Sequence, residues 1–372
     1  MNDVKNNFPK FEKMFAKNKK EFLKLIPTCK QFDKNDINKI YEALLLAEEM
    51  HKGETRKSGE AYINHPIAVA SIEAKIGLDG PTTISSLLHD VPENTHYPIS
   101  EIESQFGTDV ATIVDGVTKI GKDVNEPTHK KILNGGKKDI RVFAVKTGDR
   151  AHNMYTLSAL PPSKQIEIAT ETNDFYIPIL KILGIYEVKD ELQDLCLFYL
   201  NNDEFFKYKK IKERLEKKYN GKLNTLGEIT QDELSKMGYA MRYKYRVKNV
   251  GGMYEDIKNG TNLRKIKDLL AIKMIVDDDL ICYQTLGVVH GLGEPDFENL
   301  RDYIANPKSD GYKSLNTNIN FKDSDIQVRI RTRGMQSVND LGVFADWNMD
   351  NHKKVNEVMI KELSKLSKKG VK

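Results

Sequence analysis

The chain has 372 residues, and its 58 Lys and Arg against 54 Asp and Glu leave a formal net charge of +4. A charge so close to balance excludes a histone-like protein that coats polyanions, and it excludes an acidic disordered tail. Hydrophobic residues make up 39% of the chain and charged residues 30%, so it can bury a core under a charged surface. At roughly 150 residues per domain, the length predicts two or three domains.

Cysteine content and apolar runs narrow the class further. Cys29, Cys196 and Cys282 lie far apart without a C-x-x-C pair, so neither a disulfide framework nor a zinc ribbon is predicted. The N-terminus has no apolar targeting segment, and no run of 18 apolar residues occurs. We therefore expect a cytoplasmic protein without a membrane segment.

The first 200 residues are typical of helices. Amphipathic runs recur at 38–50, 101–114 and 185–200, and convincing strand alternation is absent. Pro81 is expected in the first turn of a helix over 81–89. We predict an all-helical domain over 1–200.

The texture of the sequence changes in the second half. Residues 203–222 form a charged helical stretch that Asn220-Gly221 closes, so we interpret 201–240 as a helical connector. Compact β-branched runs at 269–276 and 326–331 predict strands. The fold class is therefore α+β multidomain, with an α/β domain over 241–355 and a Lys-rich tail over 356–372.

A group of histidines and aspartates indicates a metal site in the helical domain, where six of the eight histidines lie before residue 153. His89 and Asp90 are adjacent after an apolar helical run, and His65 and Asp149 complete a set of two imidazoles and two carboxylates. Such a mixed set suits Mn, Fe or Zn. Each pair alone is more often a helix cap or an ion pair, so the prediction rests on the combination.

An ordered set of strings extends this observation over 51–66, 87–95, 106–107, 114–119, 138–142 and 149–157. Together these strings resemble the HD hydrolase domain of the RelA/SpoT homologue family, the enzymes that make and degrade the guanosine tetra- and pentaphosphates (p)ppGpp. The resemblance implies that His65, His89, Asp90 and Asp149 are the four metal ligands, with Mn²⁺ the usual ion. It also implies nucleotide-binding roles for Arg56, Lys57, Ser58, Asn153 and Thr156.

The resemblance assigns catalysis to Glu93 and Asn94, where the family usually has Glu-Asp. The amide of Asn94 can orient a water molecule but cannot accept a proton. Glu93 lies one helical turn from His89 if the helix continues that far. We therefore expect hydrolysis that is slowed or retuned, not abolished.

Residues 242–347 resemble the (p)ppGpp synthetase domain of the same family, a relative of the nucleotidyltransferase fold. The string from Pro307 to Leu315 is the most specific landmark. By position, the synthetase-like residues are Arg242, Lys244, Asp268, Lys308, Tyr312, Gln327 and Arg331. Tyr312 would stack on a guanine or simply pack in the core. Lys308 and Arg331 would contact phosphates or be surface charges.

Several positions depart from the synthetase pattern. Gln327 replaces the second catalytic acid, and an amide is a poor Mg²⁺ ligand and no base. Further departures are Lys248, Gly252, Asn316, 339–342 and Asp346. We expect a domain that keeps its shape without the reaction, with Mg²⁺ bound only if the domain is active.

The leading hypothesis is a metal-dependent hydrolase that removes the 3′-pyrophosphate of (p)ppGpp to give GDP or GTP, with a pseudo-synthetase domain in a structural or regulatory role. Three alternatives stay open: a bifunctional synthetase and hydrolase, a non-catalytic nucleotide-binding regulator, and a hydrolase of another 3′-phosphorylated nucleotide. Because the C-terminal modules of long family members do not follow, we expect no ribosome or direct nucleic-acid binding. The sequence leaves the oligomeric state open.

Overall fold

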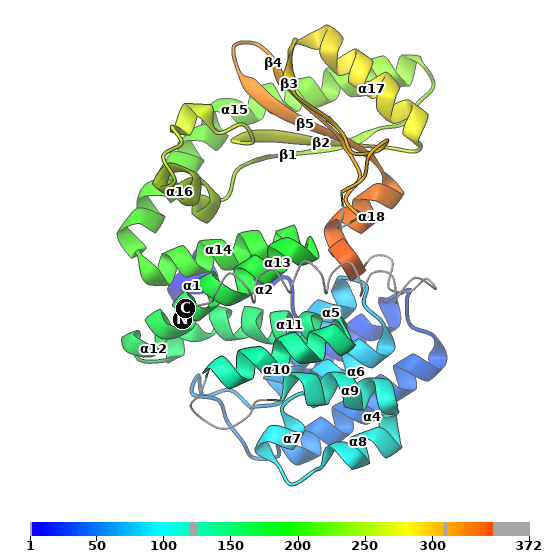
Figure 1. Ribbon diagram of the computed structural model, residues 1–372, viewed down its shortest axis with the longest axis vertical. Helices are drawn as coiled ribbons and strands as arrows, with labels where there is room; N and C mark the ends of the chain where they lie inside the picture. The colour runs from blue at the N-terminus through cyan, green and yellow to red at the C-terminus, as the bar shows by residue number, and fades with distance from the viewer. Residues whose placement is uncertain (1, 119–124, 309–310, 345–372) are drawn as a thin grey trace. The chain divides into compact units, whose positions relative to one another are not determined.

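The computed structural model describes residues 2–118, 125–308 and 311–344. The predicted tail and the landmark residue Asp346 therefore lie outside the described residues. The chain forms two compact units, the first ending at Ile182 and the second beginning at Leu183 (Figure 1). Each unit is described by itself.

The first unit is helical throughout its described length, as the sequence predicts. Its α-helices are α1 (Asn2–Asn7), α2 (Pro9–Glu12), α3 (Lys19–Leu25), α4 (Lys34–Met50), α5 (Asn64–Lys75), α6 (Gly80–Leu88), α7 (Val91–Asn94), α8 (Ile99–Phe106), α9 (Thr108–Val117), α10 (Asn125–Lys138), α11 (Arg141–Tyr155), α12 (Pro162–Glu171) and α13 (Ile177–Leu183). A π-helical turn, Thr172–Tyr176, joins α12 to α13.

Local sequence signals fix where these helices begin and end. Asp33 and Asp36 form a capping box at the start of α4. Pro81 lies in the first turn of α6, as expected. Gly107 adopts a φ of 95° and separates α8 from α9. The single helix predicted over 101–114 is therefore wrong, because a left-handed residue interrupts it.

The core of the first unit lies among α4, α5, α6, α8 and α9. Its largest side chains include Phe22, Ile40, Leu44, Ile67, Leu87 and Phe106. Helix α6 has no exposed face, since all nine of its residues except Pro81 are buried. Such burial fixes the end of α6 rigidly, and His89 follows directly.

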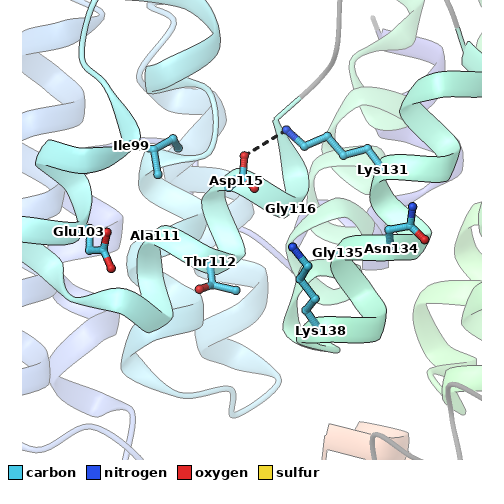
Figure 2. A pocket seen from close by; sticks show the side chains of 10 residues that line it. All are labelled: Ile99, Glu103, Ala111, Thr112, Asp115, Gly116, Lys131, Asn134, Gly135 and Lys138. Carbon is cyan, nitrogen blue, oxygen red and sulfur yellow. Dashed lines mark hydrogen bonds and ion pairs between the residues drawn. The ribbon is translucent and has the colours of Figure 1, made fainter.

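Helices α9 and α10 approach each other through glycines. A Cβ on Gly135 would lie 2.9 Å from the Cα of Gly116, so only glycine allows this separation. Figure 2 shows the open pocket beside this crossing, where Lys131 pairs with Asp115 at 3.2 Å. None of the predicted metal-site residues lines this pocket.

The second unit is a five-stranded sheet with helices. Its described elements are α14 (Tyr186–Leu200), α15 (Asn202–Lys236), β1 (Arg242–Val247), α16 (Val250–Lys258), β2 (Leu270–Val276), α17 (Asp279–Leu292), β3 (Glu294–Asp302), β4 (Leu315–Asn320), β5 (Asp325–Thr332) and α18 (Arg333–Leu341). The strand order is β1-β2-β5-β4-β3. Strands β2 and β5 are parallel, and the other neighbours are antiparallel.

Helices α15 and α17 pack along the sheet (Figure 1). Alternate strand residues, among them Ile272, Met274, Val328 and Ile330, form the core there. The helical and mixed-sheet fold class predicted from the sequence is confirmed.

Two boundary predictions differ from the structure. Helix α15 runs through Asn220-Gly221 instead of closing there, because a single exposed glycine costs a long helix only about 1 kcal/mol. Helix α14 packs on α15 and α16, so 186–200 belong to the second unit and not to the helical domain. Asp194 of α14 accepts hydrogen bonds from the backbone of Gly251 and the side chain of Asn249.

No helix within the described residues is both long enough and apolar enough to cross a membrane. The three cysteines are free thiols.

Candidate metal centre

Four side chains predicted from separate stretches of sequence meet inside the first unit. His65 lies in the first turn of α5, His89 directly follows α6, Asp90 precedes α7, and Asp149 lies in α11. Ligand atoms of His65, His89 and Asp149 all lie within 4.8 Å of one another. Oxygens of Asp90 lie 3.2 Å from Nε2 of His89 and 3.6 Å from Nε2 of His65.

The ring of His89 is oriented by the backbone. Its Nδ1 lies 2.8 Å from the carbonyl oxygen of Ser86. Because a carbonyl only accepts, Nδ1 carries a proton, and in the neutral ring Nε2 keeps the lone pair. That Nε2 atom is buried without a hydrogen-bond partner. A buried lone pair aimed at two carboxylates fits a divalent cation.

A second relay fixes the tautomer of His65. Nδ1 of His152 lies 3.2 Å from Nη1 of Arg56 and 2.9 Å from Nδ1 of His65. A guanidinium only donates, so Nδ1 of His152 is an acceptor and Nδ1 of His65 must donate to it. Nε2 of His65 therefore also presents a lone pair toward Asp90 and Asp149. Burial, together with the charge of Arg56, lowers the pKa of His65 to about 4, which keeps the ring neutral near pH 7.

The two carboxylates stay ionised although they are buried. Burial raises the pKa of Asp90, but protonated His89 and His65, together with the hydrogen bond from Tyr62, outweigh burial and lower the pKa to about 2. When both rings are neutral, a bound cation would supply that positive charge. For Asp149, Lys146 outweighs burial and holds the pKa well below its ordinary value. Nζ of Lys146 lies 3.2 Å from Oδ2 of Asp149. The centre thus offers two carboxylate oxygen donors and two imidazole nitrogen donors, a set that suits a divalent metal.

The hydroxyl of Tyr62 supports Asp90 and was missed by the sequence reasoning. It donates to Oδ2 of Asp90 at 2.7 Å. Nδ2 of Asn94 in turn donates to the same hydroxyl at 3.0 Å. Asn94 is thus linked to the metal centre through Tyr62. Helix α6 ends at Leu88, so it does not continue to Glu93 as the argument from helical spacing required.

The residues predicted to bind nucleotide lie in two places. Arg56 belongs to a loop that a bridge between Thr55 and Ala61 closes, and its Nη2 donates to Oδ1 of Asn153 at 2.7 Å. Nδ2 of Asn153 donates to Oδ1 of Asp149 at 2.6 Å. Arg56 and Asn153 therefore form one hydrogen-bonded edge of the centre.

The other three predicted residues differ in exposure. Lys57 is exposed, and the hydroxyl of Ser58 donates to Glu60 at 3.0 Å. Thr156 is buried, and its hydroxyl donates to the carbonyl of His152 at 3.0 Å. Thr156 thus caps the last turn of α11, while Lys57 stays accessible.

Two regions of the chain match known protein families. Residues 43–186 match the HD domain, and residues 245–354 match the region found in RelA/SpoT proteins. The bifunctional (p)ppGpp synthase/hydrolase SpoT of Escherichia coli is 35% identical over 86% of this chain and 47% of its own length. A guanosine-3′,5′-bis(diphosphate) 3′-pyrophosphohydrolase of Borreliella burgdorferi is 37% identical over 85% of this chain and 49% of its own.

The chain belongs to the RelA/SpoT family. It spans about half the length of these curated relatives. Among solved structures, a metazoan SpoT orthologue matches 46% of this chain and 95% of its own length at 22% identity, with a TM-score of 0.32.

The second unit carries four of the synthetase-like residues on its strands. Arg242 and Lys244 lie on β1, and Gln327 and Arg331 lie on β5. Nε of Arg329 donates to Oε1 of Gln327 at 2.6 Å, so this amide is engaged by a cation.

Tyr312 of the RelA/SpoT region is buried, with 9% of its surface exposed. Nη2 of Arg331 donates to its hydroxyl at 3.3 Å, and Nζ of Lys308 lies 4.8 Å from its ring centre. Between the two roles weighed for Tyr312, this packing favours the structural one. Lys308 lies at the ring and is exposed.

Proposed function

We propose that the helical unit hydrolyses (p)ppGpp at its 3′-pyrophosphate with a bound divalent metal, releasing GDP or GTP and pyrophosphate. The observation that carries this proposal is the arrangement of two imidazoles, each engaged through Nδ1 and turning Nε2 toward two buried carboxylates. The names of the relatives from E. coli and B. burgdorferi supply the substrate.

His65, His89, Asp90 and Asp149 would hold the ion, and Mn²⁺ is the ion that we propose. Bound there, such an ion lowers the pKa of water and polarises phosphoryl oxygens. The protein's own contribution is to keep all four ligands in their binding forms at neutral pH. The carbonyl of Ser86 orients His89, and the Arg56–His152 pair orients His65. The hydroxyl of Tyr62 orients Asp90.

Arg56 and Lys57 are the cations that we propose for the substrate. The guanidinium of Arg56 is held at 2.7 Å from Asn153, so its position is fixed before substrate arrives. The ammonium of Lys57 is exposed beside it. Two adjacent cations match the charge of a pyrophosphate group. Glu93 lies in α7, three residues after Asp90, and is our candidate for accepting a proton from water.

For the sheet unit we propose a pseudo-synthetase without pyrophosphate transfer from ATP. Gln327 carries no charge and its oxygen is occupied by Arg329. A site for Mg²⁺ needs anionic oxygens at this point. The unit would then act through its shape or through nucleotide binding.

The proposal is tested by His89→Ala in the full chain. We expect the variant to lose both bound Mn²⁺ and the release of pyrophosphate from ppGpp, since one nitrogen ligand is removed. His96→Ala is the matched control, because His96 is exposed and lies on no helix of the centre. Full turnover and unchanged metal content in His89→Ala would show that the site is assigned wrongly.

A further inference from the structure

The carboxylate of Asp268 in the sheet unit already has a cation bound to it. Nζ of Lys248 lies 2.7 Å from Oδ1 of Asp268 and 2.8 Å from Oδ2 of Asp256. The side chain of Lys248 is 16% exposed, so this ammonium bridges the two carboxylates under partial cover. It stands where a divalent ion would be held by two oxygen donors.

A glycine makes this arrangement fit. A Cβ on Gly252 would lie 3.0 Å from Cε of Lys248 and 2.6 Å from Oδ1 of Asn249. A larger residue at 252 would displace the side chain of Asn249 and require that of Lys248 to give by a few tenths of an ångström. Two departures from the synthetase pattern, Lys248 and Gly252, are therefore one structural feature.

The negative charge of Asp268 is already neutralised by the cations around it. Burial disfavours the charge of Lys248, but Asp268 outweighs it and raises the pKa of the lysine. The guanidinium groups of Arg246 and Arg329 lie 3.7 Å and 3.8 Å from Oδ2 of Asp268. A divalent ion would have to displace the ammonium and enter between two guanidinium groups, which Coulomb repulsion opposes.

The same sheet face carries a row of further cations. Lys244 on β1 lies directly opposite Lys273 on β2, and Lys273 lies directly opposite Arg329 on β5. Their side chains point away from α15, because a Cβ on Gly227 of that helix would meet the ring of Tyr243, the neighbour of Lys244. Like charges opposite one another destabilise a sheet, and a bound anion would relieve that cost.

Lys273 lies between cations and anions. Burial lowers its pKa, Asp340 and Glu187 act to raise it, and the charges of Arg331 and Lys244 act to lower it. Neutral Asn316 continues the row on β4, opposite Arg329. The row is thus a strip of cations with hydrogen-bonding amides, spaced by about 4.8 Å from strand to strand.

We propose that Lys248 is a built-in substitute for a divalent ion on Asp268, and that the sheet face binds the polyphosphate chain of a nucleotide without metal. Lys244, Lys273 and Arg329 contact the phosphates. The site lies outside the proposed hydrolytic centre and does not depend on it.

Counting Mn²⁺ by electron paramagnetic resonance tests the first half. Lys248→Met and Lys248→Gln should each bind one more Mn²⁺ per full chain than wild type, while Lys248→Arg, which keeps the charge, should not. The double variant Lys248→Met/Asp268→Asn should lose the extra ion. Equal counts in wild type and in both neutral variants would overturn the proposal, as would a wild-type ion that Asp268→Asn removes. The comparison is between variants, so it stands even if the helical centre binds no metal.

Calorimetric titration with inorganic triphosphate tests the second half. It is done in an Asp149→Asn background, so that the helical centre does not contribute. When Lys248 is present, triphosphate should bind about fivefold more weakly in excess Mg²⁺ than in EDTA, because Mg²⁺ neutralises the charge of the triphosphate. With Lys248→Met, Mg²⁺ should strengthen binding. Lys273→Met should weaken binding about tenfold in EDTA, and Lys212→Met on α15 should not. Strengthening by Mg²⁺ without the lysine substitution, or no effect of Lys273→Met, would contradict the proposal.

Discussion

The side-chain amide of Asn94 donates to the hydroxyl of Tyr62 at 3.0 Å. That hydroxyl has a single hydrogen, with which it donates a hydrogen bond to Asp90 at 2.7 Å. An amide suits this place because it supplies the hydrogen that the hydroxyl oxygen accepts. Asn94 therefore acts on the proposed ion through two hydrogen bonds, and this link explains how a neutral residue fits a position where the family usually has a carboxylate.

Tyr62→Phe tests this link. The variant keeps the ring, which stacks on His51, but loses the hydrogen bond to Asp90. Partners that orient a metal ligand are typically worth about 10- to 100-fold in affinity or activity. We expect Mn²⁺ affinity and ppGpp turnover to fall in that range, measured by metal titration and by initial rates. Wild-type values for both would show that Asp90 needs no support.

Asn94→Asp should raise the rate of hydrolysis, but by less than about tenfold. A carboxylate adds a proton acceptor, and general acid–base help is typically worth about 10²–10⁴-fold. Against this gain, the substitution removes the hydrogen bond to Tyr62, which is worth about 1 kcal/mol. Initial rates at saturating ppGpp, with Asn94→Ala as the matched control, measure the balance. An Asn94→Asp enzyme no faster than wild type would mean that the amide suits another substrate or pose.

His152→Ala should weaken metal binding without removing a ligand. Nδ1 of His152 accepts a hydrogen bond from Nδ1 of His65, and without this acceptor His65 is free to adopt the other tautomer. We expect Mn²⁺ affinity to fall about 10-fold or more. His96→Ala again serves as the control. An unchanged Mn²⁺ affinity in His152→Ala would separate this histidine from the centre.

Glu73 gives the first unit a pH-dependent stability. Its side chain is 1% exposed, Oε2 has no hydrogen-bond partner, and burial raises its pKa to about 8. The folded chain therefore binds more protons than the unfolded chain between the ordinary pKa of 4.5 and 8, so stability falls as pH rises through this window. At pH 7 the cost is about 3 kcal/mol.

Glu73→Gln should remove that dependence. By calorimetry, we expect the variant to unfold at a higher temperature than wild type near pH 8, with no advantage near pH 4.5. Gly148 faces this carboxyl, since a Cβ there would lie 2.4 Å from Oε1 of Glu73. Both the wild type and the Glu73→Gln variant therefore keep Gly148, because a larger residue there would clash with the side chain at position 73. A gain that is equal at both pH values would show that Glu73 does not titrate in the window.

Synthesis should be absent even when its product is protected. In an Asp90→Ala chain, which cannot destroy ppGpp, incubation with ATP, GDP and Mg²⁺ should yield no ppGpp. Gln327→Glu alone should not restore it, because Lys248 still occupies Asp268. Accumulation of ppGpp in the Asp90→Ala chain would establish a bifunctional protein.

The sequence predicts much of the helical unit and of its centre, and the shortfalls have physical causes. Helices with caps and apolar periodicity, such as α4 and α6, follow from local signals. The break at Gly107 and the continuation of α15 through Gly221 depend on backbone conformation that one glycine does not determine.

The same distinction holds for the site. His65, His89, Asp90 and Asp149 were predicted together from the resemblance, and the structure brings them together. The supporting contacts join residues far apart in the chain, such as His65 and His152, which are 87 positions apart. No local pattern carries such a contact. His152 could have been suspected only from its place one turn after Asp149 on the same helix.

The central claim is metal-dependent hydrolysis of (p)ppGpp, and product analysis tests it most directly. The full chain is stripped with EDTA, supplied with Mn²⁺ and given ppGpp labelled in its 3′-pyrophosphate. We predict labelled pyrophosphate and unlabelled GDP in equal amounts, formed only after Mn²⁺ is added. Binding of ppGpp without turnover, or release of single phosphate groups in place of pyrophosphate, would contradict the account.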